Sequence, residues 1–61
     1  MAGLTSRELA VLQNRLDMEK LLIQKYKLYS RQVQDPQIKN KCEQIAAKHQ
    51  THYDKLLQQL N

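Results

Sequence analysis

The sequence contains a single proline, Pro36, which follows Asp35 a little past the middle of the 61-residue chain. Aspartate is a favoured helix N-cap, proline suits the first helical turn, and the residue before a proline is disfavoured in helical geometry. One helix is therefore expected to end near Val33 and another to begin at Pro36. Because only one or two residues separate them, the two helices should fold back as an antiparallel hairpin.

The start of the first helix is marked by a capping-box pattern. At their spacing, the Thr5 hydroxyl can cap the amide of Glu8 while the Glu8 carboxylate reaches back to the chain at Thr5. From there to the corner the sequence has no glycine or proline and consists mostly of strong helix formers. The sequence thus predicts an all-α chain, one helical-hairpin domain over residues 1–61, with helices over about 5–33 and 36–60.

Both predicted helices carry an apolar stripe at steps of three and four residues. In the first helix the stripe consists of Leu9, Leu12, Leu16, Glu19, Ile23, Tyr26, Ser30 and Val33, flanked by Leu22 and Tyr29. In the second it consists of Ile38, Cys42, Ile45, His49, His52, Leu56 and Gln59, flanked by Ala46, Tyr53, Leu57 and Leu60. Two helices touch along one line and leave the sides of such stripes wet, so we expect a homodimeric four-helix bundle or a higher homo-oligomer.

The size of the chain supports the same expectation. A domain this small buries only about 60% of the surface that its unfolded form exposes, and the lone Cys42 excludes an internal disulfide framework. No apolar run approaches the roughly 20 residues of a membrane span, and no signal-peptide core is present, so a cytoplasmic protein without membrane contact is expected. Residues 1–4 and Asn61 lie outside the capping signals and are expected to fray.

The charge balance is basic, with ten Lys and Arg against six Asp and Glu and a net charge of +4. The bases are spread along both helices, and the three tyrosines do not alternate with them as stacking platforms would. A solvated basic surface is therefore favoured over a nucleic-acid-binding hairpin, which would need the bases to gather on one face. No Ser–His–Asp set, phosphate-binding glycine loop or pair of catalytic carboxylates is found, so the protein is not expected to be an enzyme.

Three polar residues interrupt the apolar stripes near mid-helix: Glu19, His49 and His52. With the corner at residues 34 and 35, residues at equal height have numbers that sum to about 69, so Glu19 faces the space between the two histidines. The three side chains are expected to converge. We favour a hydrogen-bonded cluster that fixes the helix register. The alternatives are a divalent metal site for iron or zinc and simple exposure at the edge of a broad seam. No other cofactor is expected.

These residues also carry a family resemblance over roughly residues 8–60. The pattern consists of Glu19, Tyr26, the turn at Asp35-Pro36, the run Ile45-Ala46-x-x-His49-x-x-His52, and Leu56. It resembles one half of a ferritin-like, rubrerythrin-type bundle and, more closely, the ferritin-like spore coat protein F family. In the metal-using members each half supplies one Glu from the first helix and a Glu-x-x-His pair from the second.

The resemblance matches Glu19 to the first Glu and His52 to the His, whereas His49 stands where the second Glu is expected. It therefore implies a structural protein with an altered metal site, located in the coat of a spore-forming bacterium, rather than a di-iron oxidase. The leading expectation is a non-enzymatic assembly protein that acts through homodimeric bundle formation, with coat or assembly proteins as partners. The alternatives are a small ferritin-like iron or zinc protein and the basic nucleic-acid-binding hairpin.

Overall fold

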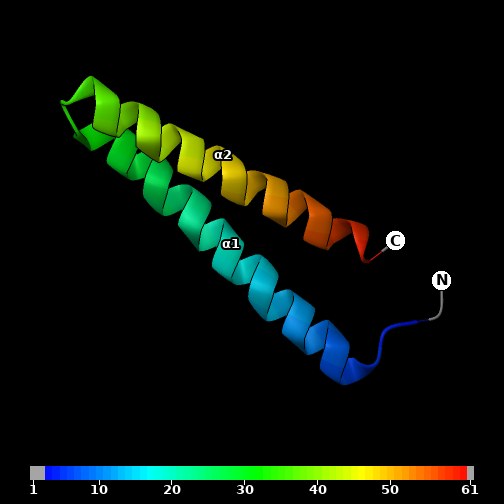
Figure 1. The fold of residues 1–61 in the computed structure, drawn as a ribbon. Helices are drawn as coiled ribbons and strands as arrows, with labels where there is room; N and C mark the ends of the chain where they lie inside the picture. The colour runs from blue at the N-terminus through cyan, green and yellow to red at the C-terminus, as the bar shows by residue number, and fades with distance from the viewer. Residues whose placement is uncertain (1–2, 61) are drawn as a thin grey trace.

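A computed structural model describes residues 3–60 and consists of two long helices that lie side by side in opposite directions (Figure 1). Helix α1 spans Ser6–Gln32, helix α2 spans Pro36–Gln58, and residues 33–35 form the corner. No strand occurs within residues 3–60. The predicted all-α hairpin is confirmed.

The start of α1 has the predicted capping box. The Thr5 hydroxyl accepts a hydrogen bond from the Glu8 amide at 3.1 Å, and the Glu8 carboxylate accepts one from the Thr5 amide at 2.9 Å. Hydrogen bonding to Thr5 lowers the pKa of Glu8 below its usual value, and the Thr5 backbone has a larger effect than the Thr5 side chain. Thr5 itself is the cap rather than a helical residue, so α1 starts one residue later than predicted.

The corner is built from Asp35 and Pro36, as the sequence predicts. The Asp35 carboxylate accepts hydrogen bonds from the amides of Gln37 at 2.8 Å and Ile38 at 3.4 Å, and Pro36 is the first residue of α2. These bonds satisfy amides that have no partner inside the helix. On the other side of the corner, α1 ends where the Val33 backbone amide donates a hydrogen bond to the Tyr29 carbonyl at 3.0 Å.

The far end of α2 departs slightly from the prediction, because the helix ends at Gln58 instead of residue 60. The amides of Gln59 and Leu60 donate to the carbonyls of Leu56 and Leu57, three residues back, which is the tighter turn common at helix ends. At the N-terminus, Leu4 was predicted to fray but packs against the core. Met1, Ala2 and Asn61, also predicted to fray, lie outside the described residues.

The core is a single seam between the helices. At its open end Leu12, Leu16 and Leu56 form a buried cluster, against which Leu4 and Tyr53 pack. The other buried side chains continue the seam toward the corner: Ile23, Ser30, Cys42 and Ala46. Burial of the Ser30 hydroxyl is tolerated because it donates to the Lys27 carbonyl at 2.7 Å.

The hairpin is one helical layer thick. Its Cα trace measures 47 × 16 × 10 Å, so each helix is covered on one side only. Several residues assigned to the apolar stripes are consequently exposed: Leu9, Tyr29, Ile38, Leu57 and Leu60. The stripes are wider than the line along which two cylinders touch, which is why these side chains remain in water. Within the described residues neither helix is long and apolar enough to cross a membrane.

The corner cap can be tested by Asp35→Ala, which removes the acceptor for two amides. We expect the free energy of unfolding to fall by about 1 kcal/mol, the usual effect of losing an N-cap. Urea denaturation at fixed protein concentration measures it. Asp54→Ala is the matched control, because the exposed Asp54 accepts only a side-chain bond from Gln50, and it should change stability by less than about 0.5 kcal/mol. Equal effects of the two substitutions would show that the cap does not stabilise the corner.

Candidate functional site

The predicted convergence of Glu19, His49 and His52 is confirmed. One ligand-type atom from each of the three side chains lies within 4.8 Å of the others, and no other group of three His, Cys, Asp or Glu residues does so within residues 3–60. Glu19 lies at the midpoint of α1, and the two histidines lie three residues apart on α2, so both rings project from one side of that helix. The rule that residues at equal height have numbers summing to about 69 holds because a corner of three residues leaves the helices little freedom to slide along each other.

A single carboxylate serves both imidazole rings. Glu19 Oε1 lies 2.6 Å from His49 Nδ1, and Glu19 Oε2 lies 3.3 Å from His52 Nδ1. The exposed fractions of the side chains are 13% for Glu19, 22% for His49 and 44% for His52. The shorter contact is therefore the more sheltered one, and His52 forms the solvent edge of the cluster.

The position of the carboxylate also assigns the histidine protons. An ionised carboxylate can only accept, so the ring nitrogen that faces it must carry hydrogen. Each neutral imidazole then holds its proton on Nδ1 and leaves a lone pair on Nε2. On this assignment Glu19 accepts a hydrogen bond from His49 and lies within ion-pair distance of His52, and no buried side-chain polar atom among the described residues lacks a partner.

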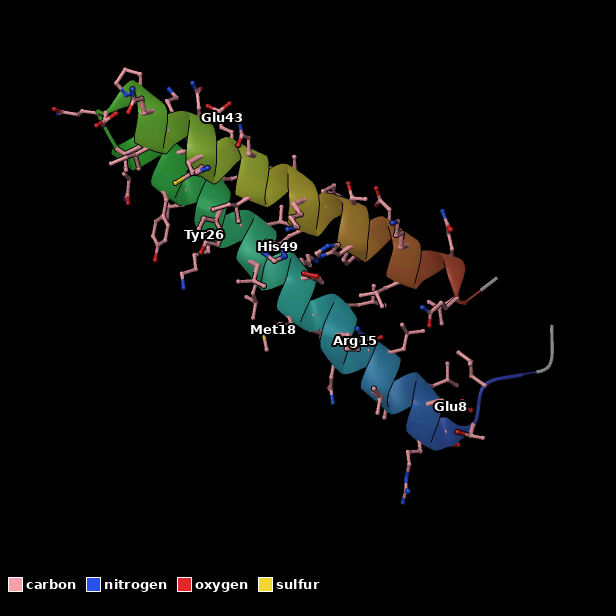
Figure 2. The ribbon with its side chains drawn as sticks, viewed as in Figure 1. Glu8, Arg15, Met18, Tyr26, Glu43 and His49 are labelled. Atoms are coloured by element: carbon pink, nitrogen blue, oxygen red, sulfur yellow. The ribbon has the colours of Figure 1, made fainter. Side chains whose placement is uncertain are left out.

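Aromatic rings extend the cluster toward the corner. The His49 ring stacks on Tyr26, with centroids 6.3 Å apart and planes 18° from parallel, and stands nearly perpendicular to the His52 ring at 5.5 Å. Tyr26 in turn meets Tyr29 edge to face at 5.7 Å. Figure 2 shows His49 pointing into the space between the helices. His49 is thus held on one side by a carboxylate and on another by a phenol ring.

The same three residues could hold a metal ion only after a rearrangement. A tetrahedral zinc ion keeps nitrogen and oxygen ligands about 3.3 Å apart, whereas Glu19 Oε1 and His49 Nδ1 are 2.6 Å apart, which is a hydrogen-bond distance. Ligation through the Nδ1 atoms would displace both protons and move the carboxylate. The geometry is that of a completed hydrogen-bonded cluster whose members are chemically suited to zinc or iron.

An open groove of about 620 Å³ lies beside the cluster, between the termini-proximal halves of the two helices. Its lining residues are Val11, Asn14, Arg15, Met18, Glu19, His52, Lys55, Leu56 and Gln59. The stripe analysis missed this groove, since it placed neither Val11 nor Met18 in the stripe. A signal was present in the sequence: Val11, Met18, Leu22 and Tyr29 recur at steps of seven, four and seven, a second apolar line on the same helix.

The basic residues are divided between the two sides of the hairpin. Arg15 and Lys55 line the groove beside His52, while Lys20 and Lys27 line a different groove with Gln50.

No family model, curated protein or solved structure matches this chain.

The strength of the Glu19–His49 contact is measurable by a double-mutant cycle with Glu19→Ala and His49→Ala. We expect a coupling energy of about 1–3 kcal/mol, because each single substitution leaves a half-buried polar group without its partner. The control cycle uses Gln50→Ala and Asp54→Ala, an exposed pair with a 3.0 Å bond, for which about 0.2–0.5 kcal/mol is expected. Similar couplings in the two cycles, measured by urea denaturation, would contradict a structural role for the cluster.

Proposed function

We propose that this chain is a non-enzymatic assembly protein whose hairpin pairs with a second copy to form a four-helix bundle. The observation that carries the proposal is the incomplete core. Among the described residues no large side chain is less than 2% exposed, and even Ala46, Leu12 and Leu16 retain 4–5%. Every core side chain touches water because the seam has helices on two sides only.

The dimensions of the hairpin support pairing with a body of similar size. A helical layer is stable when its apolar side is buried against another layer. The broad side of the hairpin measures 47 × 16 Å, which is large enough to supply the roughly 800 Å² per partner of a standard interface. A second copy of this chain offers a surface of the same length and width.

The geometry of the cluster supports a structural role rather than a catalytic one. Both oxygens of Glu19 are engaged by ring nitrogens, so the cluster ties the middle of α1 to the middle of α2. A shift of either helix by one turn would leave a half-buried carboxylate without its donors, which is unfavourable. We therefore assign Glu19, His49 and His52 the task of fixing helix register inside the bundle.

The proposed setting is a protein layer such as a spore coat, with other coat or assembly proteins as further partners. This part of the proposal is supported by the resemblance of the Glu19, Tyr26, His49 and His52 pattern to ferritin-like spore coat proteins. The hairpin is the fold which that resemblance implies. The charged outer surfaces would then be the regions that meet other proteins.

Sedimentation equilibrium tests the proposed pairing directly. We expect the mass at micromolar concentration to be about twice the 7.2 kDa of one chain, and to fall toward that of the monomer on dilution, as mass action requires. A folded monomer at all concentrations would refute the proposal. A stable higher oligomer would support assembly but exclude the simple four-helix bundle.

Divalent metal binding is a second candidate, favoured by the 4.8 Å grouping of one carboxylate and two imidazoles. Glu19, His49 and His52 would be the ligands, with zinc or iron as the ion. Because Glu19 lies at the midpoint of α1, a two-fold axis through the middle of the hairpin would bring the sets of two subunits near each other. Such an ion would stabilise the assembly rather than support oxidase chemistry, since each set contains one carboxylate.

Calorimetric titration with Zn²⁺ at pH 7 separates this candidate from the first. If the cluster is a metal site, we expect saturable binding with proton release, about tenfold or more weaker in Glu19→Gln and His52→Ala, and unchanged in the control Asp54→Asn. Absence of binding, or equal binding by Glu19→Gln, would refute it. A dimer that persists in excess chelator would show that assembly does not depend on a metal.

A further inference from the structure

The two broad sides of the hairpin differ in chemistry. One side carries the groove with Val11, Met18 and His52. The other carries a groove of about 280 Å³, lined by Lys20, Ile23, Gln24, Lys27, Gln50 and Tyr53. Val11 and Lys20 are nine residues apart on α1, and His52 and Gln50 two residues apart on α2. Each spacing turns the side chain by about 160–200°, so the two grooves lie on opposite sides.

The side with Val11 and His52 carries two lines of mainly apolar residues, bordered by polar and basic side chains that include Arg15 and Lys55. We call it the Val11 face and define it by two lines of residues: Val11, Met18, Leu22 and Tyr29 on α1, and Ile38, Ile45 and His52 on α2. Steps of seven residues keep each line on one side of its helix, and the step of four between Met18 and Leu22 widens it. Val11, Met18 and Ile38 are 52%, 59% and 51% exposed.

We infer that the second copy packs on the Val11 face, an inference that rests on the proposed homodimer and identifies its interface. The steps of seven are the spacing by which a helix keeps one seam against a neighbour in a four-helix bundle. The face runs over both helices, so its full footprint is available to the partner. The opposite side presents Lys20, Lys27 and Gln50 around its groove, which would be costly to desolvate without partners.

The charges on the Val11 face are compatible with burial. Glu19 and His52 already contact each other across the helices. Lys25 extends along the Tyr29 ring, with Nζ 5.8 Å from the ring centroid, and its flexible stem can carry the ammonium to the rim. Lys55 and Arg15 border the groove and can do the same. A partner on this face would therefore cover the apolar lines without enclosing an unpaired charge.

A third apolar surface, formed by Leu21 and Leu28, fits a second copy less well. Leu21 is nine residues from the buried Leu12, so it points about 180° away from α2. A copy that docked there would contact α1 alone and leave the groove beside His52 open. In Figure 2 Met18 projects from α1 away from α2, while His49 lies between the helices.

The test places a charge on each side of the hairpin and measures the dimer constant by sedimentation equilibrium. Val11→Glu and Met18→Glu should each weaken the dimer by about tenfold or more, because each would bury an unpaired carboxylate. The matched controls are Leu9→Glu, which lies two residues from Val11 and points to the other side, and Gln24→Glu. They should change the constant by less than about threefold. Helical circular dichroism verifies that each variant folds.

A second measurement needs no folded variant. In the unmodified protein, peroxide oxidation of Met18, followed by mass spectrometry of peptides, should slow as concentration rises through the dimer constant. Two results would overturn the choice of face alone. One is dimer loss in Leu9→Glu or Gln24→Glu but not in Val11→Glu or Met18→Glu. The other is an oxidation rate of Met18 that does not change with concentration in a protein that does dimerise. A wild-type chain that never dimerises would instead refute the proposed function.

Discussion

The short corner at residues 33–35 determines the rest of this structure. Asp35 caps α2, and Pro36 is its first residue. Because only three residues connect the helices, the position of one helix along the other is fixed. That position sets Glu19 opposite His49 and His52, thirty or more residues along the chain. Local capping chemistry is thereby converted into a long-range contact, and lengthening the corner would remove the constraint that makes the cluster form.

The Glu19 cluster occupies a place where an apolar residue would pack more simply. A leucine at this height would match Leu12, Leu16 and Ile23 in any of several registers one turn apart, because the seam offers similar apolar neighbours at each turn. A carboxylate that accepts a hydrogen bond from His49 and lies beside His52 finds both rings in one register only. The cluster thus replaces some apolar burial with a contact that specifies one alignment. Such a contact matters most in a seam whose apolar residues would fit several registers equally well.

The features that sequence predicted are those set by local chemistry or by the corner. The capping box at Thr5, the Asp35 cap, the burial of Cys42 and the meeting of Glu19 with the histidines all follow from spacing along one helix or height across the hairpin. The exposure of Leu9, Ile38 and Leu57 did not follow, because periodicity reports that a stripe is apolar but not how much of its width one neighbour covers. The Val11 face was not predicted for the same reason: the strongest stripe was assigned to the intramolecular seam. Leu22 and Tyr29 were assigned to its flank, and Val11 and Met18 were left out of it.

The cluster and the Val11 face meet at His52, and in the proposed dimer this would link alignment within one hairpin to recognition of the next. His52 contacts Glu19 on its inner side and borders the groove on its outer side. A second copy on the Val11 face would remove water from the ring, so the Glu19 contact would become the main polar partner of its Nδ1. A hairpin in the wrong register would present Glu19 unpaired at the same surface, and burying that carboxylate would disfavour assembly. In the proposed dimer, correctly aligned hairpins would then be the ones that associate, and a polar residue in the seam would help a protein whose core a second copy completes.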